Sequence, residues 1–327
     1  MKQILIIIFI FTLNSCMKSD IENLEDRVDK LEQELIVLKN IVENINNSIE
    51  IIDKLQNQFE LNSSELLDLK SKILAVEEKI NDSDGNINIL KNDIKNINKD
   101  LQDYMNQNKI FPSNVEVKST VDYNFLIEKK YKIILGKLTI ESTNISNLQG
   151  LEDLTSVGGI SILKNNSLLN LKGLDNLVSV NGRVYIKSND LLENLSGLEK
   201  IKTTEGLIIE ENSKLKDLNA LNNLISIGSS LFIIRNNSII NLKGLESLTT
   251  IGEYLNISYN ESLETLEGLN KLSYVESCFS IEHNNLLNNF SALEELITKD
   301  GLKRNYIVSG NLYNPTMQNL LDKKYTN

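Results

Sequence analysis

Residues 233–258 read IIRNNSIINLKGLESLTTIGEYLNIS, and residues 162–187 read the closely similar ILKNNSLLNLKGLDNLVSVNGRVYIK. Both stretches contain a Gly-Leu pair. Such a pair, or Ala-Leu in its place, recurs every 23 or 24 residues, beginning at Gly150, Gly173, Gly197, Ala220, Gly244, Gly268 and Ala292. A fixed period of this length indicates stacked coils, each of which buries its apolar side only against a neighbour. The sequence therefore predicts a leucine-rich parallel β-solenoid of about seven coils over residues 113–316.

Each repeat also contains an apolar–x–apolar strand motif. Because side chains alternate across a strand, the two apolar residues are expected in the core and the residue between them outside. Equivalent strands of successive coils should stack as a parallel sheet. The predicted inward pairs are Ile160/Ile162, Val184/Ile186, Leu207/Ile209, Leu231/Ile233, Leu255/Ile257 and Phe279/Ile281.

An asparagine follows each of these strands, three residues after its last inward residue. The six positions are Asn165, Asn189, Asn212, Asn236, Asn260 and Asn284. Asparagine tolerates turn conformations, and its amide both donates and accepts hydrogen bonds. We expect a structural ladder of amides at one corner of the solenoid, which is favoured over a polar binding stripe because it runs the whole length of the repeats.

The outward strand positions suggest a binding surface. Ser161, Asn256 and Ser280 are small or polar, but the middle coils place Tyr185, Ile208, Phe232 and Ile234 in neighbouring outward slots. Large apolar side chains grouped on a surface are typical of partner contacts. The sequence leaves open whether a partner binds this patch or another segment of the chain covers it.

The repeat NLKGLDNLVSVNGRVYIKSND resembles the repeats of the receptor L-domain family. Within that resemblance, VEVKSTVDYNFLIEKKYKIILGKLTI (residues 115–140) matches the opening strand and first coil, and YIVSGNLYNPT (residues 306–316) matches the close. The family forms the ligand-binding lobes of insulin- and EGF-type receptors. It also occurs in fungal wall proteins and is similar to leucine-rich surface lipoproteins of Gram-negative bacteria. The resemblance implies the fold more specifically than any ligand, and the chain lacks the receptors' cysteines.

The first sixteen residues, MKQILIIIFIFTLNSC, have the pattern of an export signal. One lysine precedes an apolar run that is shorter than the roughly 20 residues needed to span a bilayer. The Leu13–Cys16 stretch resembles the lipobox of bacterial lipoproteins, in which the chain is cut before the cysteine and the thiol is acylated. The expected organisation is therefore a signal peptide over residues 1–15 and a lipidated tether over 16–19, with Cys16 the anchor in the membrane.

Residues 20–108 carry apolar side chains at alternating spacings of three and four, from Ile21 through Val28 and Leu35 to Ile52, and in a second run from Leu66 to Leu101. This heptad seam, with charged residues between, predicts a coiled-coil stalk through which the chain forms a homo-oligomer. The sequence leaves open a dimer or a trimer. Asn81–Asn86 could form a hairpin turn or a polar interruption of one helix; because Ile80 and Ile87 are seven residues apart, the unbroken heptad frame favours a locally loosened continuous helix.

Composition limits the chemistry of this 327-residue chain. A net charge of −11 argues against a nucleic-acid partner. The single histidine, His283, and the second cysteine, Cys278, lie on ordinary repeat positions, where we expect a surface imidazole and a buried thiol. The residues predict no metal site, cofactor or catalytic group. The adjacent Glu210 and Glu211 are expected to point opposite ways and so to form no acid/base pair.

Together these features predict a lipid-anchored protein of the bacterial outer membrane, exposed at the cell surface. It would display a leucine-rich module on a coiled-coil stalk and bind a protein or a glycan. The alternative is a structural spacer of the envelope without a specific ligand. Residues 317–327 are expected to be a C-terminal tail.

Overall fold

The computed structural model describes residues 71, 72, 75 and 87–326. The expected signal peptide, Cys16 and most of the predicted stalk lie outside these residues. The described end of the stalk range is helix α4 (Ile87–Gln107). Within the described part of the chain, no helix combines the length and the apolar character needed to cross a membrane.

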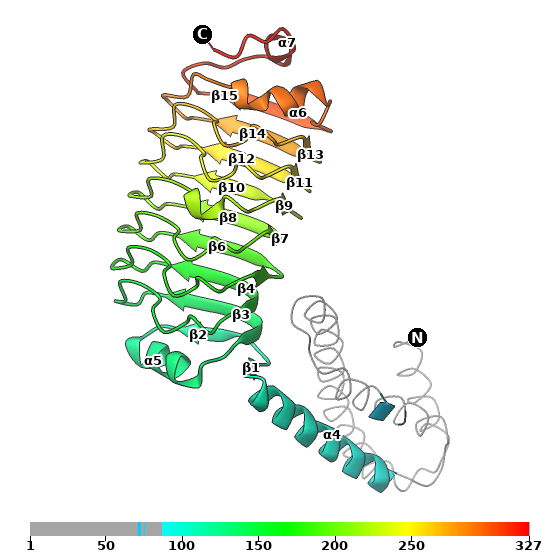
Figure 1. Ribbon diagram of the computed structural model, residues 1–327. Coiled ribbons are helices and arrows are strands. Elements are labelled where there is room, and N and C mark those ends of the chain that lie inside the picture. Colours follow the sequence, from blue (N-terminus) through cyan, green and yellow to red (C-terminus); the bar gives the residue numbers. More distant parts are fainter. Residues whose placement is uncertain (1–70, 73–74, 76–86, 327) are drawn as a thin grey trace, which may run out of the picture. The chain divides into compact units, whose positions relative to one another are not determined.

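The main element of the structure is an 11-stranded sheet, here called sheet A. All of its pairings are parallel, and its long strands lie side by side in chain order, as Figure 1 shows. The order is β1-β3-β4-β6-β8-β10-β12-β14-β15, while β2 pairs with β3 and β5 with β4. The strands are β1 (Ile110–Phe111), β2 (Val115–Val117), β3 (Ile133–Glu141), β4 (Ser156–Leu163), β5 (Ser179–Val180), β6 (Arg183–Lys187), β8 (Gly206–Glu210), β10 (Leu231–Ile234), β12 (Tyr254–Ser258), β14 (Cys278–Glu282) and β15 (Asn305–Ser309).

The pairing register follows the sequence repeat. Leu231 of β10 pairs with Leu207 on one side and with Leu255 on the other, so equivalent residues of successive coils lie in one row. Parallel neighbours are possible here because each coil returns the chain to the same end of the sheet. The predicted parallel, solenoid-like β fold is confirmed.

A second, four-stranded parallel sheet, here called sheet B, was not predicted from the sequence. Each of its strands has only two residues, too few to show a periodic pattern. Its order is β13-β11-β9-β7, from β7 (Thr203–Thr204), β9 (Ser226–Ile227), β11 (Thr250–Ile251) and β13 (Tyr274–Val275).

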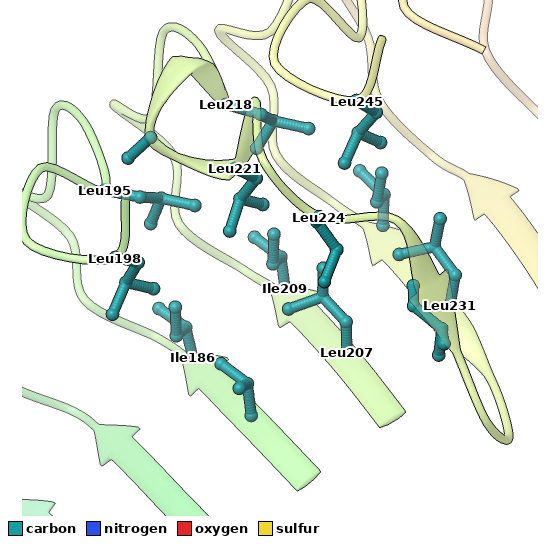
Figure 2. Close-up of a cluster of buried hydrophobic side chains, with 14 of the residues drawn as sticks. Ile186, Leu195, Leu198, Leu207, Ile209, Leu218, Leu221, Leu224, Leu231 and Leu245 are labelled. Carbon is teal, nitrogen blue, oxygen red and sulfur yellow. The ribbon is translucent and has the colours of Figure 1, made fainter. Parts of the chain in front are cut away.

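The core lies inside the coils and is filled mainly by leucine and isoleucine. Figure 2 shows how Ile186, Leu207 and Ile209 from sheet A meet Leu195, Leu198 and Leu218 from the loops of neighbouring coils. All twelve predicted inward residues are buried, none more than 2% exposed. Full burial of such a side chain contributes roughly 1.5–3 kcal/mol, so the stacked coils supply the main stabilising term.

Helices close both ends of the core. At the start, α5 (Thr120–Lys129) buries Tyr123 and Leu126. At the end stand η2 (Ser291–Leu293), α6 (Glu294–Thr298) and α7 (Met317–Leu321), and α7 buries Leu320. The range expected as a tail therefore begins with a helix that packs on the last coil, where a solenoid needs a cap.

The six ladder asparagines are fully buried and hydrogen-bonded from coil to coil. Asn236 is representative: its Nδ2 donates to the Ile209 carbonyl oxygen at 2.8 Å, and its backbone N–H donates to Asn260 Oδ1 at 2.9 Å. The Oδ1 atom of Asn236 in turn accepts from the backbone N–H of Asn212 at 3.1 Å. The side-chain amide of Asn236 thus satisfies backbone groups of the preceding coil, and its backbone N–H is satisfied by the asparagine of the following coil.

The ladder extends beyond the six predicted asparagines, by Thr143 at its start and by Asn311 and Asn314 at its end. Thr143 donates its backbone N–H to Asn165 Oδ1 at 3.0 Å, and Asn311 accepts from Asn284 in the same way. Asn314 then accepts from the backbone N–H of Asn311 at 2.9 Å. The signal was present, because Thr143 and Asn311 also stand three residues after an inward residue, Ile140 and Val308.

The left-handed conformation at the corner belongs to the residue before each asparagine. The asparagine itself has no positive φ and contributes to the corner through its hydrogen bonds. Seven successive corners carry a non-glycine residue with φ between 54° and 57°, and Gly310 takes the eighth with φ 68°. We call these positions the corner row: Ser142, Lys164, Ser188, Glu211, Arg235, Tyr259, His283 and Gly310.

The loops that contain a Gly-Leu pair and those that contain an Ala-Leu pair have different backbone conformations. Gly173, Gly197, Gly244 and Gly268 have φ between 107° and 118°, and a Cβ on any of them would lie within 2.1 Å of a carbonyl oxygen of the preceding coil. Where alanine replaces glycine, the loop instead forms a 3₁₀ turn, η1 (Asn219–Leu221) or η2. The glycines are therefore required by both φ and close coil packing.

Replacing Asn236 with alanine should lower the free energy of unfolding by about 3 kcal/mol, because buried donors and acceptors in two coils lose their partner. Urea denaturation of the purified chain measures this. Asn237→Ala is the matched control, since Asn237 Oδ1 is buried without a hydrogen-bond partner among the described residues. Equal losses in the two variants would contradict the role assigned to the ladder.

Gly197→Ala should cost about 2 kcal/mol or more, because φ is 117° and the new Cβ would lie 2.1 Å from the Leu171 carbonyl oxygen. Gly228→Ala is the control: the nearest atom to its Cβ lies at 3.7 Å and its φ is not positive. That variant should be neutral or slightly stabilised. Thermal melts of both proteins, monitored by circular dichroism, test the difference. A Gly197→Ala protein as stable as Gly228→Ala would refute it.

Candidate binding surface

The four predicted patch residues lie on three adjacent strands of sheet A. Tyr185, Ile208 and Phe232 are register partners across β6, β8 and β10, and Ile234 follows Phe232 by two residues on the same face. Neighbouring strands are about 4.8 Å apart, so these side chains form a continuous apolar stripe on the outer face. The structure thus brings all four residues together.

The stripe is half-buried and stands apart from the core. None of its four side chains belongs to the buried cluster or to the hydrophobics packed against that cluster. The outer face is not uniformly open, however. Ser161, in the same row beside Tyr185, is 0% exposed, although its position predicted an outward residue. A small side chain between larger neighbours is covered even on an outer face.

Charged side chains border the stripe at the ends of the same strands. Lys187 Nζ lies 3.0 Å from Glu210 Oε1 and 3.6 Å from Glu211 Oε2. The expectation that Glu210 and Glu211 point opposite ways was therefore wrong. Glu211 has φ 57°, which turns its side chain back toward the face that Glu210 occupies. Alternation across a strand fails where the strand ends in a left-handed residue.

The surroundings of Glu211 in this cluster favour its ionised form. A hydrogen bond from the Ser188 hydroxyl, at 2.8 Å, lowers the pKa of Glu211, and nearby Lys187 lowers it further. The hydrogen bond to Glu210 raises the pKa of Lys187. A general acid needs the opposite shift, a raised carboxyl pKa. The arrangement suits fixed surface charges that orient a partner.

Three residues of the corner row stack along the solenoid axis beside the stripe. The Arg235 guanidinium lies 5.0 Å from the centroid of the Tyr259 ring, and the Tyr259 and His283 rings are stacked with centroids 4.8 Å apart. Arg235 Nη1 also comes within 4.0 Å of Glu210 Oε1, which joins the stack to the ion cluster. Sequence reasoning missed this row because its residue types share no pattern.

The corner row adopts a conformation that costs non-glycine residues roughly 1–2 kcal/mol each. Glycine or asparagine would relieve this cost, yet seven of the eight corners carry neither. An unfavourable backbone state retained repeatedly points to a use for the side chains. We therefore include Arg235, Tyr259 and His283 with the apolar stripe in one candidate binding surface.

Cys278 and His283 do not form a reactive pair. They stand near opposite ends of β14, five residues and thus roughly 16 Å apart along an extended strand. Cys278 is half-buried on the outer face rather than fully buried as expected, and burial raises the pKa of its thiol. In the part of the chain that the structure describes, no group of three or more His, Cys, Asp or Glu side chains is placed to hold a metal ion.

Comparison of the chain with protein-family models, with curated proteins and with solved structures gives no significant match.

Proposed function

We propose that this chain is a surface lipoprotein of the bacterial outer membrane that displays a receptor L-domain-like solenoid on a coiled-coil stalk. The solenoid binds a protein or a glycan through the candidate binding surface. The cysteine at position 16 anchors the chain through its lipid, and the stalk makes it a homo-oligomer. The binding role requires no cofactor.

The observation that carries this proposal is the position of the apolar stripe. Tyr185, Ile208 and Phe232 occupy one register row on a rigid parallel sheet, and a charged cluster borders them. An apolar centre with a polar rim is the usual anatomy of a protein interface. Because the strands are fixed by the core beneath them, the surface is preorganised, which lowers the entropic cost of binding.

The proposed place in the cell comes from the sequence. The Leu13–Cys16 lipobox-like stretch supplies the anchor, and acyl chains contribute roughly 0.8 kcal/mol per buried CH₂. The heptad pattern over residues 20–108 supplies a spacer between anchor and solenoid. The resemblance to the receptor L-domain family rests on the leucine-rich repeats, which are about two dozen residues long. A shared fold does not identify the ligand.

Protease treatment of intact cells should remove the solenoid, while a periplasmic marker protein survives. The Cys16→Ser chain, which lacks the acceptor thiol, should leave the membrane fraction. Immunoblots of fractionated cells measure both results. A solenoid that resists protease until the cells are lysed would instead favour the structural spacer.

The double variant Tyr185→Ala/Phe232→Ala should retain its melting temperature, because neither side chain belongs to the core, and should lose binding at least about tenfold. The probes are a glycan array and a displayed peptide library, each first screened with the unchanged chain. Thr203→Ala/Thr250→Ala on sheet B is the control and should bind normally. A double variant that unfolds would show that the stripe is structural, and one that binds normally would move the site elsewhere.

A further inference from the structure

The last strand of sheet A has a neighbour on one side only. β15 pairs in parallel with β14, and no other strand of the described chain pairs with its far side. At five residues, β15 is as long as β14, with Ile307 at its centre 42% exposed. An exposed edge of this kind is a ready template for another strand.

The hydrogen bonds to β14 identify the groups at the free edge. Asn305 donates its N–H to the Ser277 carbonyl oxygen at 3.0 Å, and the Ser309 carbonyl oxygen accepts from His283 at 2.9 Å. Bonding direction alternates along a strand, so residues 305, 307 and 309 face β14. The N–H and C=O groups of Tyr306 and Val308 therefore face away from the sheet.

The C-terminal cap covers the core without pairing with this edge. Its residues Met317, Leu320 and Tyr325 pack on the core, and the Tyr325 carbonyl oxygen accepts from Phe290. Its contact with β15 is through a side chain, the Tyr306 hydroxyl donating to the Pro315 carbonyl oxygen at 2.7 Å. No backbone hydrogen bond joins the cap to Tyr306 or Val308 within residues 87–326.

We propose that the free edge of β15 pairs with the same edge of a second copy of this chain, antiparallel and centred on Ile307. In this register Tyr306 faces Val308 of the other copy, and the two residues exchange both backbone hydrogen bonds. The two Ile307 side chains meet at a non-hydrogen-bonded position, where Cα atoms approach to about 4.5 Å. All four free N–H groups of the two edges are then satisfied.

Side chains around the strand favour a second copy over an unrelated peptide. Arg304, just before β15, is exposed and forms no ion pair within the described part of the chain. Glu282 is in register with Ser309, at the other end of the strand. The two-fold axis brings Arg304 of each copy to the end where Glu282 of the other copy lies, so their charges complement each other.

The pair joins the solenoids by their C-terminal ends, and the ends that carry α5 point apart. Two five-residue strands bury less than the roughly 1,200 Å² of a stable interface, so the contact is weak between free molecules. The paired state becomes populated where the effective concentration of copies is high, for example between chains anchored on two opposed membrane surfaces. That setting rests on the proposed function, whereas the strand pairing itself does not.

The test is site-directed disulfide formation in the full chain with Cys16→Ser and Cys278→Ser, so that each variant has one thiol. Ile307→Cys should form a disulfide-linked dimer in air at least about tenfold faster than Ser280→Cys, because only position 307 meets its own copy within disulfide range. Ser280 is the matched control, since it is the register partner of Ile307 one strand inward. Equal rates at the two positions would overturn the proposal.

Two added changes separate edge pairing from chance collision through the stalk. Val308→Pro removes a free-edge N–H and leaves the bonds to β14, so in the Ile307→Cys chain it should abolish the excess dimer without altering the circular dichroism spectrum. Arg304→Glu should slow dimer formation as well, through repulsion from Glu282, and salt should relieve this effect. Dimer formation that survives both changes would refute the pairing, whether or not the candidate surface binds a ligand.

Discussion

The fold depends on one constraint: at the corner of each coil the backbone must change direction, and the buried backbone N–H and C=O groups there must still find hydrogen-bond partners. A coil must leave sheet A, reverse its direction, and keep the next coil within hydrogen-bonding distance. The left-handed corner residue supplies the change of direction, and the buried asparagine after it supplies the missing donors and acceptors. Because each asparagine bonds to the preceding coil through its amide and to the following coil through its backbone N–H, the corner hydrogen bonds form a continuous chain. In a low-dielectric interior such bonds reinforce one another.

This constraint explains why the repeat length is nearly fixed. Successive amides must meet, so the ladder partners are 23 or 24 residues apart through the middle of the solenoid. Larger departures occur only at the ends, with 22 residues between Thr143 and Asn165 and 27 between Asn284 and Asn311, where α6 is inserted. A coil can vary in its loops, provided that its asparagine still reaches the next one.

Features that repeat by residue type were predictable from the sequence, and features that depend on backbone conformation alone were not. The inward strand residues and the ladder asparagines have fixed identities, and the apolar stripe followed from alternation. The corner row could not be predicted, because lysine, glutamate, arginine, tyrosine and histidine do not share a residue-type pattern and are not expected at positive φ. For the same reason the convergence of Glu210 and Glu211 on Lys187 was missed, since it follows from the sign of one φ angle.

The two-residue strands of sheet B are too short to be predicted from periodicity. The sequence also did not indicate that the loop with Ala220 forms a 3₁₀ turn, unlike the loops that contain glycine.

The ladder positions and the corner row are constrained differently, and this difference determines which side chains can vary to form a binding surface. Each of the six asparagines is constrained by at least three hydrogen bonds, whereas the residue before it is constrained mainly in backbone conformation. Seven successive coils carry a side chain at this position, so each of them offers one variable side chain beside the variable outward strand positions. Here that freedom places Arg235 directly after Ile234 and Tyr259 directly after Ser258, the register partner of Ile234, with His283 stacked on Tyr259. Because preorganisation by the ladder reduces the entropic cost of ordering these side chains, the rigidity that fixes the repeat also makes its outer rows effective for recognition.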